Sequence, residues 1–261
     1  MQRGFPFEKL SSETAAAFDR YVQAAESRMN ADLPPARFLR VDAEPDLKAK
    51  LRGGELRIES GRASGSSDEI KVPGGLLQDW VGSMFIPNAT LQQVKTVLQD
   101  YESYKNFYKP EVIESRQIAH QGDDYDILLR LYEKHILTVV LNANYHVHYA
   151  LPDARRMLVT SHSTRIAEVR DAKRSYTEER PVGDDTGFLW RLNSYWRFEE
   201  ADGGVYAECE AISLSRDVPL GLGWMLKGFL ERFPKESMLN TLRGTRAAVR
   251  NLAARDTSAA Q

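Results

Sequence analysis

The sequence predicts an α+β domain in which a curved antiparallel sheet wraps around one long C-terminal helix. From about residue 111 to residue 215, apolar and polar residues mostly alternate, which is typical of strands that bury one face. Most connections in this region are short and turn-like, which favours antiparallel neighbours. The chain then ends in an amphipathic helical pattern over 220–253, and this helix is the available cover for the apolar face of the sheet.

An extension is expected to precede this domain over residues 1–74. Residues 12–30 carry apolar side chains at helical spacing, which predicts an amphipathic helix that packs on the main domain. Alternation over 55–59 and 69–72 predicts two short strands on either side of a Gly/Ser-rich loop. The main domain is expected to cover 75–254 and a frayed tail 255–261.

Within the main domain the elements are predicted in the following order. A strand over 76–86 ends at Pro87, Asn88 is the expected N-cap of the next helix, and a short helix follows over 102–107. Six strands then follow, at about 111–120, 125–134, 137–150, 156–169, 188–199 and 205–215. The charged segment 170–187 is predicted as a long loop, and loops of that length are often lids or binding loops. Pro234 is compatible with the first turn of a continuing terminal helix.

Composition and charge exclude several classes of protein. The chain has 261 residues, of which 42% are hydrophobic and 28% charged, so it is not of the disordered class. A net charge of -2 argues against nucleic-acid binding, and no stretch approaches the ~20 apolar residues of a transmembrane helix. The single cysteine, Cys209, excludes an internal disulfide and a Cys-rich zinc site. The composition leaves the oligomeric state open.

The first ten residues contain no apolar core of the length that a signal peptide needs. This fits a cytoplasmic protein, and it fits equally a periplasmic or secreted protein whose export signal has been removed. The compartment therefore stays unassigned.

The alternation also predicts which side chains face the interior. In the strand over 137–150, Tyr145 belongs to the apolar face. Two further strands are expected to contribute to the same interior face. The strand over 188–199 contributes Trp190, Leu192, Ser194 and Trp196, and the strand over 205–215 contributes Cys209 and Ala211. A hairpin that pairs Phe198 with Val205 places large residues beside small ones on this face, and arginines beside glutamates on the other.

The small residues among them allow two interpretations. Ser194, Cys209 and Ala211 leave room for a ligand, or the tryptophans, including Trp224 of the terminal helix, fill that room. A one-residue bulge would reverse the faces of a strand. The charged residues would then point inward and form a polar anchor for a pocket, which is the alternative role of Arg191, Arg197, Glu208 and Glu210.

Four segments of this pattern resemble the START-like, or SRPBCC, superfamily with its helix-grip fold, to which polyketide cyclases and the birch-pollen allergens also belong. They are DWVGSMFIPNATLQQV (79–94), YESYKNFYKPEV (101–112), GFLWRLNSYWRFEEADGGVYAECEAISLSRDVP (187–219) and PKESMLNTL (234–242). The resemblance covers about 76–253 and implies an apolar tunnel for lipids, sterols or polyketides between sheet and helix. It further implies that 170–187 gates the entrance and that an Arg–Glu pair lies in the cavity. The extension 1–74 departs from the minimal domain of the family, and we expect it to close one end of the tunnel.

No P-loop, HExxH or GxSxG motif is present, and no cofactor is expected. We therefore favour the binding or transport of a hydrophobic small molecule over catalysis. The expected contacts are Tyr145, Trp190, Leu192, Ser194, Trp196, Cys209, Ala211, Trp224 and Phe229.

Two alternatives stay open. The first is an enzyme of the cyclase or dehydratase type that uses Glu208, Glu210, Tyr145 and a histidine as acid and base groups. The second is a metal site formed by His146, His148 and His162. We favour the simpler interpretation, in which these three histidines are solvated polar residues on the outward face.

Overall fold

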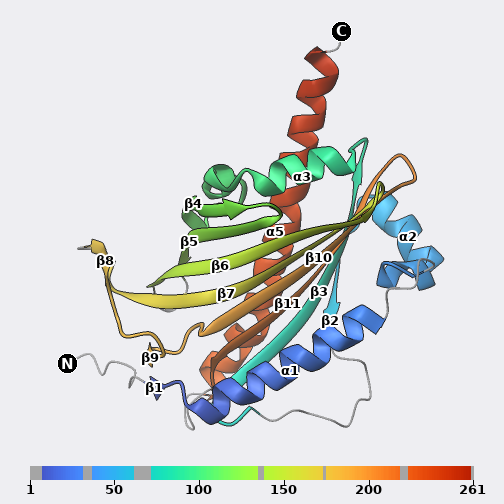
Figure 1. The fold of residues 1–261 in the computed structure, drawn as a ribbon. Helices are drawn as coiled ribbons and strands as arrows, with labels where there is room; N and C mark the ends of the chain where they lie inside the picture. Colours follow the sequence, from blue (N-terminus) through green and yellow to red (C-terminus); the bar gives the residue numbers. More distant parts are fainter. Residues whose placement is uncertain are drawn as a thin grey trace.

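The computed structural model describes residues 8–31, 37–61, 72–134, 138–172, 175–217 and 223–259, with the backbone alone at residues 8, 223–233 and 259. Its centre is a nine-stranded, curved antiparallel sheet (Figure 1). The strand order is β2-β3-β11-β10-β7-β6-β5-β4, with β8 attached to β7. The strands are β2 (Arg57–Ser60), β3 (Gly75–Pro87), β4 (Val112–Gln121), β5 (Asp124–Lys134), β6 (Thr138–Asp153), β7 (Arg156–Asp171), β8 (Ser175–Glu179), β10 (Arg191–Ala201) and β11 (Gly204–Arg216). A separate pair consists of β1 (Glu8–Lys9) and β9 (Asp184–Asp185).

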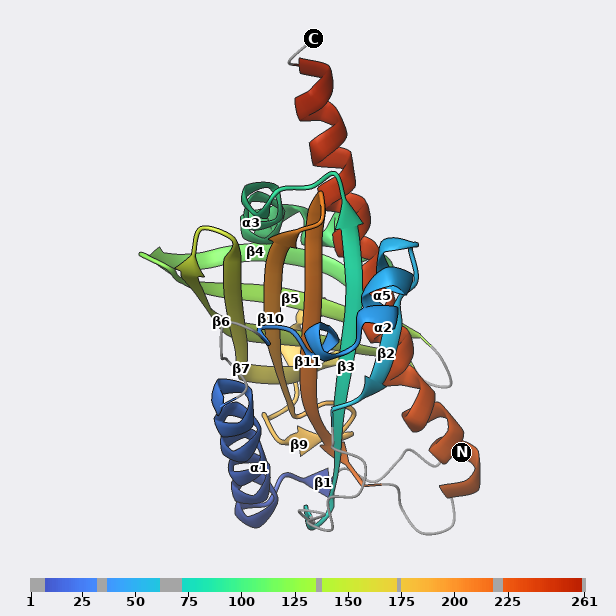
Figure 2. The same ribbon diagram turned by 90° about the vertical axis from the view of Figure 1, so that its right-hand side faces the viewer.

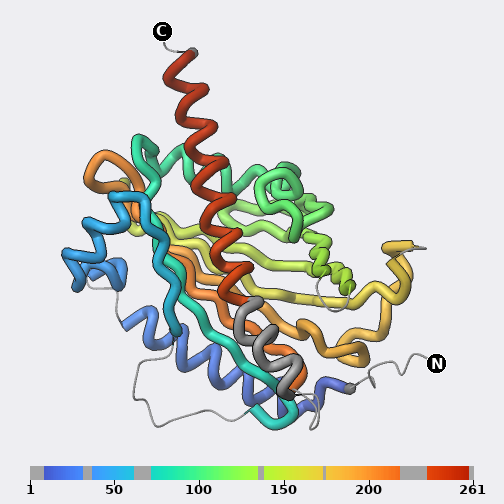
Figure 3. Tube along the Cα trace, turned by 180° about the vertical axis from the view of Figure 1, so that it is seen from behind, coloured from blue at the N-terminus to red at the C-terminus, as the bar shows by residue number. Residues whose placement is uncertain are grey.

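Helices cover both faces of the sheet. They are α1 (Ser12–Ala31), η1 (Arg40–Ala43), α2 (Pro45–Arg52), α3 (Leu91–Gln99), η2 (Tyr101–Ser103), α4 (Tyr104–Phe107) and α5 (Gly223–Ala259). The helix α5 runs across one face, here called the inner face, and α1 lies on the opposite, outer face (Figures 1 and 3). On the outer face, α2 packs beside β3, near β2 at one edge of the sheet (Figure 2). The architecture is therefore the predicted sheet around a terminal helix, with a further helical layer outside.

The contact between α5 and the sheet depends on a glycine. Gly82 of β3 lies under α5, and a Cβ atom at this position would come within 2.8–2.9 Å of side-chain atoms of Met238 and Leu242. The absence of a side chain lets the helix approach the sheet closely here. Because Gly82 pairs with Cys209 of β11, the helix is seated over the β3–β11 side of the sheet.

The turn between β10 and β11 sets the register of the central hairpin. Asp202 and Gly203 have φ values of 53° and 77°, and positive φ at both central residues is what a two-residue type I′ turn requires. The ladder starts from Ala201 and Gly204, so Phe198 pairs with Ala207. The expected pairing with Val205 is wrong by two residues, which leaves the face of every side chain unchanged because strand alternation has a period of two.

Several predicted boundaries need correction. Asn88 has a φ of 57° and lies in a turn, whereas Thr90 is the N-cap of α3, in a reciprocal capping box with Gln93. The segment 170–187 contains β8 and β9, so it is not a continuous loop. The strand predicted over 188–199 begins only at Arg191.

The terminal helix is longer than predicted. It continues through Pro234 and ends at Ala259, so residues 255–259 are helical where a frayed tail was predicted. Residues 69–71, most of the second short strand predicted for the extension, lie outside the described residues. Over the part of the chain that is described, no helix has the length and apolar character that crossing a membrane requires.

Candidate functional site

A cavity of about 270 Å³ lies between the inner face of the sheet and α5. Its walls come from β3, β5, β6, β7, β10 and β11, and from the segments around α3, α4 and Ser237 of α5, and most of the lining is apolar. The volume is just below the ~300–1,000 Å³ that is typical of small-molecule pockets. A cavity of this size and character accommodates a small apolar ligand.

Small side chains form the floor of this cavity. Ser161, Ser194 and Ala211 are direct cross-strand neighbours on β7, β10 and β11, and all three line the cavity. Cys209 and Ser213 continue the floor along β11. Because these side chains are short, the inner face does not reach α5 here, and this explains why the space under the helix is not filled.

Aromatic side chains line the cavity at the level of α3 and α4. The hydroxyl groups of Tyr101 and Tyr149 lie 2.8 Å apart, and those of Tyr149 and Tyr104 both donate to the carbonyl oxygen of Leu98. The Tyr108 hydroxyl lies 3.0 Å from Thr245 Oγ1. All four hydroxyl groups have partners within the protein, so these tyrosines build the wall.

Tyr145 is the exception. Its side chain is only 4% exposed and lines the cavity, and its hydroxyl group has no hydrogen-bond partner among the described residues. Burial raises its pKa above the usual value of 10, so the hydroxyl is neutral and can both donate and accept a hydrogen bond. A buried polar group without a partner is unfavourable by about 1–3 kcal/mol.

Two carboxyl groups also line the cavity, near the end of β5. Burial and the neighbouring charge of Glu111 raise the pKa of Glu133 to about 8. Glu111 accepts hydrogen bonds from Ser237 Oγ (3.0 Å) and Asn240 Nδ2 (2.8 Å), both on α5. Neither glutamate was predicted as a site residue, although Ile127, Leu129, Leu131 and Glu133 follow the inward alternation of β5, and this signal is visible in the sequence.

The raised pKa of Glu133 predicts a stability that depends on pH. Between its usual pKa near 4.5 and about 8, the folded chain holds a proton that the unfolded chain releases, so the free energy of unfolding falls as the pH rises through this window. Glu133→Gln removes this dependence. We expect urea unfolding to show the variant more stable than wild type by about 2–4 kcal/mol at high pH, with no difference in strong acid. Glu178→Gln, at an exposed position of β8, is the control, and an equal pH profile for both variants would contradict the assignment.

Six of the predicted contact residues line the cavity: Tyr145, Leu192, Ser194, Trp196, Cys209 and Ala211. Trp190 lies elsewhere, since β10 begins one residue after it, and its ring packs on the outer face in a cluster with Phe18 and Ile212. Its Nε1 donates to Asp185, 3.1 Å away, and Phe188 and Leu189 line the cavity in its place. The side chains of Trp224 and Phe229 lie outside the described part of the chain.

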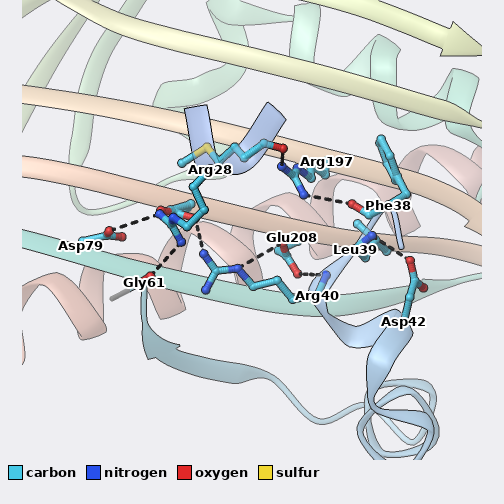
Figure 4. Close-up of polar contacts among 11 residues, drawn as sticks. Arg28, Phe38, Leu39, Arg40, Asp42, Gly61, Asp79, Arg197 and Glu208 are labelled. Carbon is cyan, nitrogen blue, oxygen red and sulfur yellow. Dashed lines mark hydrogen bonds and ion pairs between the residues drawn. The ribbon is translucent and has the colours of Figure 1, made fainter. Parts of the chain in front are cut away.

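The predicted charged anchors lie on the outer face (Figure 4). Arg197 donates to the carbonyl oxygens of Met29 (2.6 Å) and Phe38 (3.1 Å). Glu208 accepts from the backbone N–H of Arg40, whose side chain pairs with Glu210 at 2.6 Å. The β10–β11 ladder is continuous from Arg191 to Ala201, without the bulge that would turn these groups inward. Arg197, Glu208 and Glu210 therefore attach the extension to the sheet, whereas Arg191 donates to the carbonyl oxygen of Trp190.

The remaining expectations concern the ends of the cavity. No described residue of the extension lines it, so the described helices of the extension cover the outer face and take no part in the lining of the cavity. No described residue of 170–187 lines it either, although Phe188 follows directly. The expectation that 170–187 gates an entrance therefore has no support from a contact with the cavity.

Three of the five histidines, those of the metal-site alternative, lie outside the cavity. His146 and His148 hydrogen-bond to Asp126 and Asp124, while His162 lies 2.9 Å from Glu26 of α1. None of them lines the cavity, so they do not supply the acid or base that the enzyme alternative placed there. Over the described ranges, no group of three or more potential ligands has an arrangement that could hold a metal ion.

Comparisons with known proteins bear on the fold. No family model and no curated protein matches the sequence. Among solved structures, a STAR-related lipid transfer protein from Xanthomonas axonopodis is similar, with a TM-score of 0.51, 17% identity, and coverage of 75% of this chain and 93% of that chain. The Zhui aromatase/cyclase from a Streptomyces species matches with a TM-score of 0.47 and 9% identity, over 67% of this chain and 94% of its own. Human STARD10 matches with a TM-score of 0.46 and 12% identity, over 82% of each chain.

The structure of the STAR-related lipid transfer protein supports the assignment of the fold. At 17% identity the likeness concerns the fold alone, and it extends over most of both chains. It agrees with the element order and with the position of α5 against the inner face of the sheet. The chain therefore has the START-like helix-grip fold.

Proposed function

We propose that this chain binds and carries a small hydrophobic molecule of the lipid, sterol or polyketide type in the cavity beneath α5. The single observation that carries the proposal is the apolar cavity of about 270 Å³, whose lining includes the buried Tyr145 with a hydroxyl group that has no described protein partner. The hydroxyl groups of the other four described cavity tyrosines have hydrogen-bond partners within the protein. The Tyr145 hydroxyl is therefore the tyrosine group that we assign to the ligand. The fold shared with a lipid transfer protein supports the same class of ligand.

Replacement of Tyr145 by phenylalanine tests the anchor. The change removes one hydroxyl group and keeps the ring, so we expect affinity for a ligand with a polar group to fall about 3–10-fold, the contribution of one neutral hydrogen bond. The ligand is first identified by native mass spectrometry and organic extraction of the purified protein, and then titrated by the fluorescence of Trp196 and Trp80, which line the cavity.

Tyr195→Phe is the matched control, since the Tyr195 hydroxyl is also buried but donates to Glu26 on the outer face. We expect its affinity to equal that of wild type. Equal affinities for the Tyr145 and Tyr195 variants would remove Tyr145 as the anchor. A protein that extracts with no apolar molecule and binds none on titration would overturn the proposed function.

One observation favours the second candidate, a cyclase or dehydratase. Glu133 has a pKa near neutrality in an apolar cavity, as a general acid or base requires. However, Glu133 pairs with Val139, six residues from Tyr145 along β6, so the Cα positions of the two residues lie about 20 Å apart along the strands. This separation argues against joint action of the two side chains on one bond. Conversion of the extracted molecule by wild type and not by Glu133→Gln would favour catalysis over carriage.

A further inference from the structure

A row of serine hydroxyl groups crosses the floor of the cavity. Ser161 of β7 and Ser194 of β10 are direct cross-strand neighbours. Ser194 pairs with Ala211 of β11, so Ser213, two residues further along that strand, is its diagonal neighbour. All three serines line the cavity, and their hydroxyl groups form no hydrogen bond with a described residue. The floor therefore offers three neutral hydroxyl groups to a molecule in the cavity.

The buried Tyr145 continues this row on β6 and is an independent indication of a ligand. Val147 of β6 pairs with Ser161, so Tyr145 is the diagonal neighbour of Ser161 on the same inner face. The Tyr145 side chain is only 4% exposed, and its hydroxyl group has no described partner. Most buried polar groups in proteins are hydrogen-bonded, because leaving them unpaired is unfavourable. A polar group of a ligand would satisfy this hydroxyl.

The geometry of the sheet sets the spacing of the serines. Directly opposed side chains on neighbouring strands have Cβ atoms about 4.5–5.5 Å apart, and diagonal neighbours lie about 7–8 Å apart. The first value applies to Ser161 and Ser194, and the second to Ser194 and Ser213. Oxygen atoms on adjacent rings along one edge of a fused ring system are separated by distances of the same order. A molecule with such an edge therefore fits the row.

The other sides of the cavity are mainly apolar. Pro234 and Met238 come from α5, and Leu98 comes from α3. Ser237, also on α5, donates its hydroxyl group to Glu111 and is therefore already paired. The cavity thus combines one floor of neutral hydroxyl groups with apolar surroundings, which suits a ligand that is polar on one side and apolar on the other.

We propose that the ligand is a mainly apolar molecule with two or more neutral oxygen atoms along one edge, and that this edge lies on the row of Ser161, Ser194 and Ser213. The inference rests on the proposed function and names the ligand class of the same cavity. Hydroxyl and carbonyl oxygens both suit the row, because a serine hydroxyl donates and accepts hydrogen bonds. The Tyr145 hydroxyl binds a further oxygen at one end. A plain hydrocarbon would leave these groups unpaired and is disfavoured.

Two isomeric ligands test the proposal. In 2,7-dihydroxynaphthalene both hydroxyl groups lie on one side of the long axis, whereas in 2,6-dihydroxynaphthalene they lie on opposite sides, and naphthalene has none. Equilibrium dialysis at neutral pH is expected to show the 2,7 isomer binding about fivefold more tightly than the 2,6 isomer, the contribution of one hydrogen bond. In the double variant Ser161→Ala/Ser194→Ala this preference is expected to disappear, while naphthalene binds as before. Ser194→Ala alone, at the centre of the row, should lower the preference about twofold.

Ser83→Ala is the matched control, because Ser83 is also a buried serine of the sheet but pairs with Glu208, whose side chain lies on the outer face. It should keep the full preference for the 2,7 isomer. Failure of all three compounds to bind would overturn the proposed function itself. Binding of naphthalene with equal affinities for the two isomers would overturn this inference alone. A preference that survives in the double variant would assign the selectivity to other residues and also overturn it.

Discussion

Replacing Arg197 with methionine is expected to lower the free energy of unfolding by about 3–5 kcal/mol, the usual cost of removing one partner from a buried charged network. The Arg197 side chain is buried and donates to the carbonyl oxygens of Met29 and Phe38. Met29 lies in the last turn of α1, where carbonyl groups lack helical partners, and Phe38 begins the segment that leads to η1. Methionine keeps most of the apolar volume of the side chain and removes every hydrogen-bond donor. The decrease in the free energy of unfolding therefore measures the contribution of the polar contacts.

The carboxylates beside Arg197 add to this effect. Burial raises the pKa of Glu208, and the neighbouring positive charges of Arg40 and Arg197 oppose that rise. Without Arg197, Glu208 keeps only Arg40 as a described cationic neighbour. A buried carboxylate with less compensation is destabilising at neutral pH.

Arg191→Met is the matched control. Arg191 lies on the same strand and the same face, but it is only partly buried and its side chain donates to the neighbouring carbonyl oxygen of Trp190. We expect urea unfolding to show a change below about 1 kcal/mol for this variant, together with unchanged limited proteolysis of the extension. Equal losses for both variants would mean that the extension is not held through Arg197.

Replacing Ala211 with phenylalanine is expected to abolish ligand binding, with an affinity at least 100-fold lower than that of wild type. Ala211 lies in the floor of the cavity beside Ser194 and Trp80. The phenyl ring would enter the space that the ligand occupies. Because this space is empty in the protein alone, we expect the melting temperature to stay within a few degrees of wild type.

Fluorescence titration with decanol and a thermal melt measure both quantities. Ala119→Phe, at an exposed position of the edge strand β4, is the control and should bind decanol as wild type does. A variant with phenylalanine at position 211 that still binds would place the ligand outside the cavity. A variant that no longer folds would be replaced by Ser194→Phe, which enters the same space from β10.

Much of the inner face could be predicted from alternation. Tyr145, Leu192, Ser194, Trp196, Cys209 and Ala211 all line the cavity, as their positions in the strands indicate. Trp190 could not be placed in this way, because alternation holds only within a strand and β10 starts at Arg191. Glu133 had the right alternation, but an acidic residue at the end of a strand is more often solvated, so the pattern alone did not select it.

For the charged residues, too, alternation predicted the face of the sheet but not the partners. Alternation placed Arg197, Glu208 and Glu210 on the face opposite the small residues, and the ladder confirms that face. Their partners could not be predicted, because Arg28 and Arg40 come from a segment more than 150 residues earlier in the chain. A long-range pairing of this kind leaves no periodic signal in either segment.

Alternation and helical spacing were therefore sufficient for the succession of strands along the chain, the faces of the central hairpin and the amphipathic terminal helix. These are local properties, since each follows from residues a few positions apart. The volume beneath α5, the lack of a described partner for the Tyr145 hydroxyl and the position of Glu111 and Glu133 in the cavity lining were decided by tertiary packing. They depend on how closely the helix approaches the curved sheet, a distance that is set by contacts such as those of Gly82 with Met238 and Leu242.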